Sequence, residues 1–324
     1  MEKPYISIVI PTYNSASTLG QTVESCLGQD YPKDKLEIIV VDDGSKDNTE
    51  EVVKRFPVKY IYQERRGPAA ARNNGFRNSK GDGICFIDAD CVPYKDWISK
   101  LVQHYDKDNV GAVAGSYAVG TSRYLLDKSV HCEIKYRHSM MPGYTTSFGT
   151  YNVLVRRSVF KELGGFNTLY YNASGEDNDL SYRIIKAGYK IYFEKDALVS
   201  HNNILRFWRY LGIQFRHSYW RMKLYKENVS MVMKDKYGYW KDFVEIFLVA
   251  ASIVYVLLNL QGKFLMLGVL ATVLFLIQLP FSLKVSLDKK DIRYLGFSFV
   301  TFIRAFVRVL GGIVGFIRFW VIRG

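Results

Sequence analysis

Phe86-Ile87-Asp88-Ala89-Asp90-Cys91 is the stretch of this 324-residue chain that decides its fold. The apolar residues 84–87 predict a buried strand, and two carboxylates one residue apart follow it directly. Because the alternation of side chains breaks where a strand ends, Asp88 and Asp90 can both turn toward one point. In open α/β sheets, ligands bind in the crevice beyond the carboxyl ends of the strands. The stretch therefore predicts an α/β sheet with a ligand site at this edge.

Two carboxylates in this position are also compatible with a metal site. Hard oxygen ligands that leave coordination positions open suit Mg²⁺ or Mn²⁺, ions that can bridge to the phosphates of a substrate. Aspartate equally favours surface turns, so an isolated Asp-x-Asp would indicate no more than a turn. The neighbouring segments have to decide between these two interpretations.

Strand and helix patterns alternate through the segments before Asp88. Strands are predicted at residues 6–10, 36–41, 58–62 and 84–87. Helices are predicted between them, beginning near Ser17, near Asp47 or Asn48, and at Gly67-Pro68. This alternation is typical of a parallel α/β sheet, in which helices connect consecutive strands. We therefore expect Asp88 to lie at the carboxyl edge of such a sheet.

Further polar residues are expected at the same edge. Asp42 and Asp43 follow the second strand, and carboxylates there can accept hydrogen bonds from a nucleobase N–H or a ribose hydroxyl. Arg72 and Asn73 lie on a helix that should line the same crevice, and an arginine suits phosphate or carboxylate neighbours. Each residue alone is compatible with a turn or a solvated helix face. Their convergence on one edge favours a binding site.

These segments resemble the large second family of inverting nucleotide-sugar glycosyltransferases. The resemblance is carried, in family order, by Ser7-Ile8-Val9-Ile10-Pro11-Thr12-Tyr13-Asn14, Val41-Asp42-Asp43-Gly44-Ser45, Ala71-Arg72-Asn73-Asn74-Gly75, Asp88-Ala89-Asp90, Gly164-Gly165-Phe166 and Gly175-Glu176-Asp177. It extends from about residue 5 to about residue 220. The resemblance implies a GT-A fold with a mostly parallel central sheet, a nucleotide-diphosphate sugar donor and a divalent metal.

The resemblance also implies a role for individual positions. The donor would be bound by Pro11, Tyr13, Asp42, Asp43, Arg72, Asn73 and Asp88. The aspartate after the second strand would contact the base, and the Asp-x-Asp would contact the ribose and the metal. Two short strands are predicted at residues 191–193 and 197–200, and the second ends at His201. His201 would either complete the metal shell of Asp88 and Asp90 or form a structural hydrogen bond. An imidazole added to two carboxylates would favour Mn²⁺.

Asp177 is the residue for which the resemblance implies catalysis, as the general base. It precedes a predicted helix, so its other role would be that of an N-terminal cap, and the two roles are compatible. The positive end of a helix dipole favours an anion, and we therefore expect a lowered pKa for Asp177.

The net charge of the chain is not enough by itself to identify what the protein binds. A formal net charge of +13 is compatible with nucleic acid, a membrane surface or a phosphorylated substrate, and the four cysteines lack metal-finger spacing. Residues 204–226 interleave arginines with aromatic residues, as helices that bind nucleic acid or lie at membrane interfaces do. Because apolar segments follow, we expect membrane lipids as partners and no nucleic acid.

Two of these segments are about long enough to cross a hydrocarbon core of roughly 30 Å. Residues 243–260 contain one charge near their start, and residues 264–283 contain none. The short connection at 261–263 predicts a helical hairpin, and basic residues on both flanks place both flanks in the cytoplasm. A buried pair of helices in a soluble domain is the alternative interpretation.

The last apolar segment, residues 295–322, contains Arg304, Arg308 and Arg318. Two arginines in the middle of a span would cost roughly 2.5–3.5 kcal/mol each on insertion scales. We therefore expect a helix that lies in the plane of the interface, in preference to a third span.

The sequence thus predicts a cytoplasmic GT-A domain at residues 1–228 and a membrane domain at 229–324, in a multi-pass protein of the cell membrane. Residues 121–146 lack a clear period and are expected to carry acceptor specificity. The expected reaction is inverting, metal-dependent transfer of a sugar to a hydroxyl of a lipid-linked saccharide or other glycan. The alternatives are a polyprenyl-phosphate glycosyltransferase, whose acceptor phosphate needs no base, and a catalytically silent nucleotide-sugar-binding membrane module.

Overall fold

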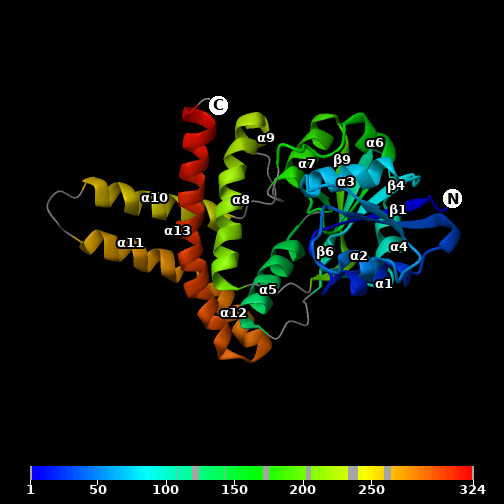
Figure 1. Cartoon of the computed structure of the whole chain (residues 1–324). Coiled ribbons are helices and arrows are strands. Elements are labelled where there is room, and N and C mark those ends of the chain that lie inside the picture. The colour runs from blue at the N-terminus through cyan, green and yellow to red at the C-terminus, as the bar shows by residue number, and fades with distance from the viewer. Residues whose placement is uncertain are drawn as a thin grey trace. The chain divides into compact units, whose positions relative to one another are not determined.

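The computed structural model describes residues 2–107, 109–118, 124–141, 143–170, 175–201, 206–232, 240–258 and 264–322 (Figure 1). The chain divides into two compact units. The described residues before 122 and those between 134 and 203 form one, here called the sheet unit. Residues 122–133, 204–233 and 238–324 form the other, here called the helical unit.

The sheet unit is built on one mixed sheet with the strand order β3-β2-β1-β4-β8-β6-β9-β5, and β7 also pairs with β9. The strands are β1 (Ile6–Thr12), β2 (Leu36–Asp42), β3 (Lys59–Tyr62), β4 (Gly83–Phe86), β5 (Cys91–Pro93), β6 (Val110–Tyr117), β7 (Tyr144–Thr145), β8 (Val153–Arg156) and β9 (Lys190–His201). The first four are parallel, as expected from the crossover helices. β8 is antiparallel to both of its neighbours, and β5 and β7 are antiparallel to β9.

Helices cover both faces of the sheet because its central strands are apolar on both sides. These helices are α1 (Leu19–Leu27), α2 (Thr49–Val53), α3 (Pro68–Arg77), α4 (Trp97–Val102), α6 (Arg157–Glu162) and α7 (Glu176–Lys186), with a 3₁₀ turn at Lys33–Lys35. Ile8 of β1 packs in the cluster under α1, α2 and α4, whereas its neighbour Val9 packs in the cluster with α3, α6 and α7. Figure 1 shows these two groups of helices on opposite sides of the sheet. The predicted α/β fold class is confirmed.

Two segments differ from the sequence-based expectation. Residues 121–146 contain α5 (Leu125–Ser139), whose buried side chains include the polar Asp127 and His131, so the apolar period of a helix is missing. Some of that segment, namely residues 121–123 and 142, lies outside the described residues. β9 is one strand where two short ones were expected, because its pairing with β6 continues across an irregularity between Glu194 and Leu198.

The helical unit contains α8 (Phe207–Glu227), α9 (Val229–Val232), α10 (Trp240–Leu258), α11 (Leu265–Leu276), α12 (Leu279–Lys289) and α13 (Phe297–Phe316), with short turns at Ile292–Gly296 and Ile317–Val321. Within the described residues, Leu265–Lys289 and Ile292–Val321 are long and apolar enough to cross a membrane, by length and composition alone. The expected second span is interrupted between α11 and α12, next to Pro280, which cannot donate a helical hydrogen bond. The expected tight connection at 261–263 lies outside the described residues.

α13 packs along α8, and the two helices run parallel. Gly311 of α13 lies against the carbonyl oxygen of Phe215, and Gly315 lies one turn further on, against that of Tyr219. With no side chain at the two glycines, the helix backbones approach closely. This pair of glycines therefore fixes where the two helices cross.

The arginines of α13 lie on the face that packs against protein. Arg304 is buried and donates to both carboxylate oxygens of Glu133, at 2.6 and 3.0 Å, and to the hydroxyl of Tyr210. Arg308 donates to Asp242 at 2.9 Å and to Gln214 at 2.8 Å. The insertion free energy of an unpaired arginine therefore does not apply to Arg304 or Arg308, because each guanidinium has a carboxylate partner. The arginines alone are not a reason to keep α13 out of a membrane.

The glycine contact predicts different effects for two neighbouring substitutions in α13. A Cβ at position 311 would lie 2.4 Å from the oxygen of Phe215, whereas a Cβ at position 312 would meet no atom within 4 Å. Gly311→Ala should therefore destabilise the protein by about 1–3 kcal/mol through overpacking. Gly312→Ala should be neutral or stabilise it by up to about 1 kcal/mol, since alanine is the better helix former. Thermal unfolding of the two variants in detergent tests this, and equal melting temperatures would contradict the close packing.

Candidate functional site

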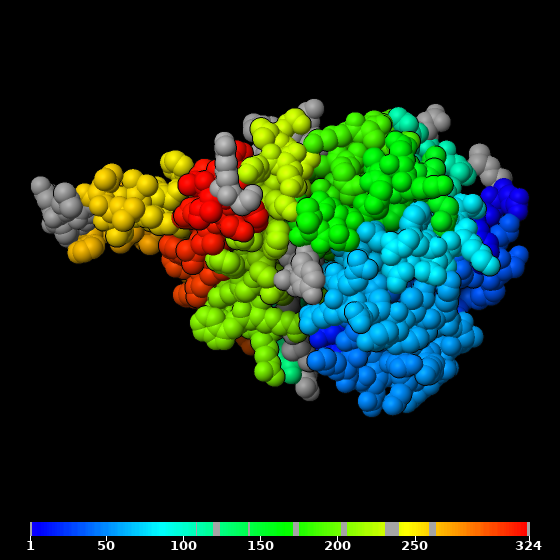
Figure 2. All heavy atoms as spheres, turned by 45° about the horizontal axis from the view of Figure 1, so that its top comes forward, coloured from blue at the N-terminus to red at the C-terminus, as the bar shows by residue number. Residues whose placement is uncertain are grey.

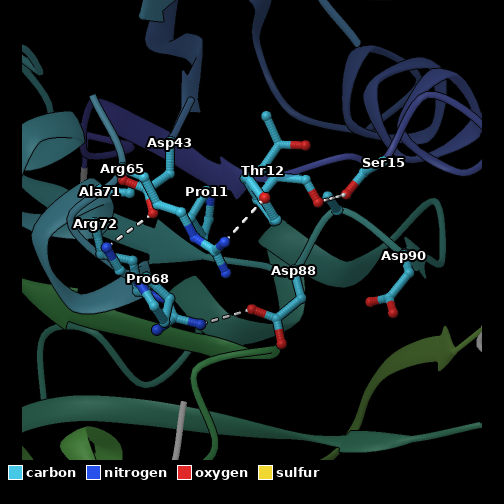
Figure 3. Close-up of a pocket in the computed structure, with 13 residues that line it drawn as sticks. Pro11, Thr12, Ser15, Asp43, Arg65, Pro68, Ala71, Arg72, Asp88 and Asp90 are labelled. Atoms are coloured by element: carbon cyan, nitrogen blue, oxygen red, sulfur yellow. Dashed lines mark hydrogen bonds and ion pairs between the residues drawn. The ribbon is translucent and has the colours of Figure 1, made fainter. Parts of the chain in front are cut away.

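The site is a cavity of about 290 Å³ at the carboxyl ends of β1, β2 and β4 (Figure 3). Six of the predicted site residues line it, namely Pro11, Tyr13, Asp43, Arg72, Asp88 and Asp90. Thr12, Ser15 and Arg65 are among the other lining residues. Asp42, Asn73, Asp177 and His201 are not among the lining residues. The strand ends thus bring together most of the predicted positions.

Asp43 shapes the wall of the cavity. One of its carboxylate oxygens accepts from the backbone N–H of Arg66 and from the amide of Gln63, and the other accepts from the backbone N–H of Gly67. Gly67 has a φ of 89°, which glycine adopts without strain, and α3 begins at the next residue. Asp43 therefore holds the turn that opens α3 against the cavity.

Asp42 has a different environment, although it is only one residue earlier. Its carboxylate accepts from the backbone N–H of Ser45 at 2.8 Å and from the hydroxyl of Tyr60 at 2.9 Å. Because side chains alternate at the end of β2, the carboxylate of Asp42 is held by the turn and by β3. Its contacts are those of a structural residue.

Arg65 is a cavity residue that the sequence reasoning missed. Its guanidinium lies 3.9 Å from the centre of the Tyr13 ring and donates to the Tyr13 hydroxyl at 2.9 Å. This cation–π contact joins the turn before α3 to the end of β1. The position of Arg65, just before the helix start at Gly67-Pro68, could have suggested that it lies at the cavity. Its contact with Tyr13 could not be predicted, because the two residues are 52 positions apart in the sequence.

Arg72 is buried at 2% exposure and bridges two carboxylates. One terminal nitrogen donates to Asp88 at 2.8 Å, and the other donates to Glu176 at 2.9 Å. Figure 3 shows the side chain of Asp88 turned toward this guanidinium. Arg72 thus lines the cavity while being held from both sides. Glu176, which belongs to α7, is the second residue that the sequence reasoning did not assign.

Asp90, His201 and the buried Cys91 form a group that could hold a metal ion, because one ligand atom from each lies within 4.8 Å of the others. The neighbouring Asp88, which was predicted as a ligand, is not in this group. β5 pairs with β9 so that Cys91 lies opposite His201, which brings the imidazole Nε2 to 3.3 Å from Asp90 Oδ1. Two neighbouring ligands at about 2.1 Å from an octahedral ion would be about 3.0 Å apart, so this separation suits a shared ion. Burial and the carboxylate of Asp90 raise the pKa of Asp88, against the lowering effect of Arg72. A positive charge close to Asp88 and Asp90 would relieve the repulsion between their two carboxylates.

Asn73 and Asp177 lie outside the cavity lining, for different reasons. Asn73 exchanges two hydrogen bonds with the backbone of Phe166, at 2.8 and 2.9 Å, and so anchors the turn that contains Gly165. One residue along a helix turns the side chain by about 100°, which separates Asn73 from Arg72. Asp177 is the second residue of α7, after the N-cap Gly175, and its carboxylate accepts from the backbone N–H of Asn178.

The pKa expected for Asp177 was wrong in direction. Burial, and then the neighbouring carboxylate of Glu176, raise the pKa of Asp177 to about 7, although Asn178 and Arg72 act to lower it. Removal from water outweighs the helix dipole here, because the dipole contributes only a small stabilisation. A carboxyl group with a pKa near 7 can exchange a proton at neutral pH.

Sequence comparison places this site in a known family. The sequence profile described as "Glycosyl transferase family 2" matches residues 7–164, and the one described as "N-terminal domain of galactosyltransferase" matches residues 128–204. These matches cover the strand ends, α3, the Asp-x-Asp and α7.

Curated relatives are named as glycosyltransferases. Glycosyltransferase AglE of Haloferax volcanii is 31% identical over 209 residues, 61% of this chain and 67% of that protein. Probable glycosyltransferase YdaM of Bacillus subtilis is 34% identical, over 61% of this chain and 50% of that protein. Pre-mycofactocin glycosyltransferase of Mycobacterium tuberculosis is 32% identical, over 61% and 43%. The chain therefore spans about half the length of the latter two.

Two solved structures share the fold. Mannosyltransferase PcManGT from Pyrobaculum calidifontis, in complex with GDP-Man and Mn²⁺, matches with a TM-score of 0.68 and 20% identity, over 100% of this chain and 89% of that one. GalNAc-T7 with UDP, GalNAc and Mn²⁺ matches with a TM-score of 0.50 and 23% identity, over 63% and 44%. The mixed sheet is that of the GT-A glycosyltransferases, and the chain belongs to glycosyl transferase family 2.

Proposed function

We propose that this chain transfers a sugar, with inversion and with a divalent metal ion, from a nucleotide-diphosphate sugar to a hydroxyl of a lipid-linked saccharide. The observation that carries the proposal is the cavity at the strand ends, where Asp43, Asp88 and Asp90 converge. Both solved relatives were determined with Mn²⁺ and a nucleotide or nucleotide sugar.

The donor would bind with its nucleoside against the β1 and β2 ends and its diphosphate toward the Asp-x-Asp. At the ends of β1 and β2, where the nucleoside would lie, Asp43 supplies a carboxylate. The Tyr13–Arg65 pair supplies a cationic, aromatic surface there. Asp88, Asp90 and His201 would hold the metal ion. When bound, this ion would neutralise charge on the leaving diphosphate.

Asp177 would accept the proton of the attacking hydroxyl. An inverting transfer takes place in one displacement, so the acceptor must lose its proton as it bonds to the anomeric carbon. A base with a pKa near the working pH is suited to this task, and the pKa of Asp177 is about 7. Arg72 and Glu176 lie beside it and would hold it in place.

A lipid-linked acceptor is proposed because the helical unit offers a surface that suits a bilayer. α10 and α11 project away from α13 in Figures 1 and 2, and Phe247, Leu257 and Leu265 on them are more than 70% exposed. Residues 246–258 and 264–276 carry no charge. Each segment rises about 20 Å along a helix, which is less than the hydrocarbon core of about 30 Å. The pair would enter the membrane as a hairpin from the cytoplasmic face, with α13 along the interface.

A panel of nucleotide sugars, incubated with purified protein and native lipid extract and followed by mass spectrometry, tests the reaction. We expect transfer from one class of donor, its loss with EDTA and its recovery with Mn²⁺ or Mg²⁺. Asp90→Asn should weaken donor binding at least tenfold with little change in melting temperature, since Asp90 is half-buried at the cavity edge. Full activity in EDTA would reject the metal, and no transfer or donor hydrolysis with any sugar would favour a silent binding module.

The pKa of Asp177 predicts the pH dependence of transfer. The ionised carboxylate is the base, so kcat should rise as the pH increases through about 7 and should fall about tenfold per unit below it. Asp177→Asn should lose about 10²–10⁴-fold in kcat with donor affinity and melting temperature retained, because an amide cannot accept the proton. Transfer by this variant at the parent rate would remove Asp177 from the mechanism and favour a lipid phosphate as acceptor.

A hairpin predicts that both flanks of the membrane segments lie on one side. A reporter fused after residue 324 should therefore behave as cytoplasmic, like one fused to the N-terminus. The N-terminal fusion serves as the control for expression. An external C-terminal reporter would show an odd number of crossings, and Ile292–Val321 would then be the additional span.

A further inference from the structure

Glu176 is a buried acid that the reaction proposed above leaves without a chemical role. Its side chain is 3% exposed, and one of its oxygens accepts from Arg72 at 2.9 Å. Its other oxygen lies 3.2 Å from the backbone nitrogen of Gly175, at the N-cap of α7. Glu176 therefore connects α3 to the start of α7, across 104 residues of sequence.

Arg72 is held in one orientation by this contact. Its planar guanidinium spans Asp88 and Glu176 with separate nitrogens, and it faces the ring of Phe166 at 5.7 Å. Without the carboxylate of Glu176, the guanidinium nitrogen that now donates to Glu176 would lose this anionic partner. Both nitrogens could then pair with Asp88, which arginine readily does in a bidentate manner.

We propose that Glu176 is a positioning residue, which acts through Arg72 to hold the first turn of α7, and Asp177 with it, at a fixed place relative to Asp88. This rests on the proposed function, in which Asp88 is on the donor side and Asp177 acts on the acceptor. The ion pair thereby fixes how far the base Asp177 lies from Asp88, which would hold the metal ion beside the donor. A misplacement of about 1 Å between reacting groups can cost about 100-fold in rate.

The same residue sets the charge around Asp177. The charged groups with the largest effect on the pKa of Asp177 are Glu176 on its own helix and Arg72 on α3, and the backbone N–H of Asn178 donates to its carboxylate. Glu176 raises the pKa of Asp177, and Arg72 lowers it. Neutralising Glu176 should therefore shift the titration of Asp177 to lower pH, an effect that a purely structural residue would not have.

Two substitutions separate the effect of the negative charge of Glu176 from the effect of its side-chain length. Glu176→Gln keeps the length of the side chain and an oxygen that can accept from Arg72, but removes the charge. Its kcat at pH 8 should fall about tenfold or more, the donor KM should stay within about twofold, and the acidic limb of the pH profile should move to lower pH. Glu176→Asp keeps the charge but is shorter by one methylene. In Glu176→Asp, the acidic limb of the pH profile should stay at the same pH as in the parent enzyme, while kcat falls.

Asp179→Asn is the matched control, because Asp179 is a buried acid in the same first turns of α7 that pairs with Arg183 at 2.7 Å. It should lower the melting temperature but leave the acidic limb in place. An unmoved limb in Glu176→Gln, or a donor KM that rises in proportion to the loss of rate, would overturn the positioning role. A parent enzyme without an acidic limb would instead reject Asp177 as the base, and the role of Glu176 with it.

Discussion

The site depends on the parallel pairing of β1 with both β2 and β4. In this register Thr12 lies beside Asp42 and Val9 beside Phe86, so all three strands end at the same edge of the sheet. The residues that follow, including Asp43 and Asp88, have no strand to continue and turn into the crevice. Gly75 allows α3 to lie close against this sheet, since a Cβ there would come 2.3 Å from Val9. The position of Arg72 on α3 follows from that packing.

Each carboxylate at this edge has a defined donor. Asp43 accepts from backbone N–H groups, Asp88 from Arg72, and Asp90 lies beside His201. A buried anion is costly unless it is paired, and these contacts supply a partner for each carboxylate. Burial still raises the pKa of Asp88, and it raises the pKa of Asp177 to about 7. Asp43, Asp88 and Asp90 line the crevice, whereas Asp177 lies outside its lining.

The sequence predicts the strand ends well because a buried strand has a strong apolar signal and ends at a polar turn. It cannot separate Asp42 from Asp43, or Arg72 from Asn73, since the direction of a side chain depends on strand alternation and helix rotation at one residue. Arg65 and Glu176 escape it because their partners are 52 and 104 residues away. The pKa of Asp177 depends on burial, which sequence spacing does not report. α5 was missed because its buried face is partly polar.

The central claim is that the crevice binds a nucleoside diphosphate together with a divalent ion held by Asp88, Asp90 and His201. Anomalous diffraction from crystals grown with MnCl₂ and a nucleoside diphosphate tests it most directly. The predicted result is a manganese peak at about 2.1–2.3 Å from Asp90 and His201, with Asp88 facing it and the nucleoside beside Asp43. A manganese ion or a nucleotide bound elsewhere on the protein would contradict the claim.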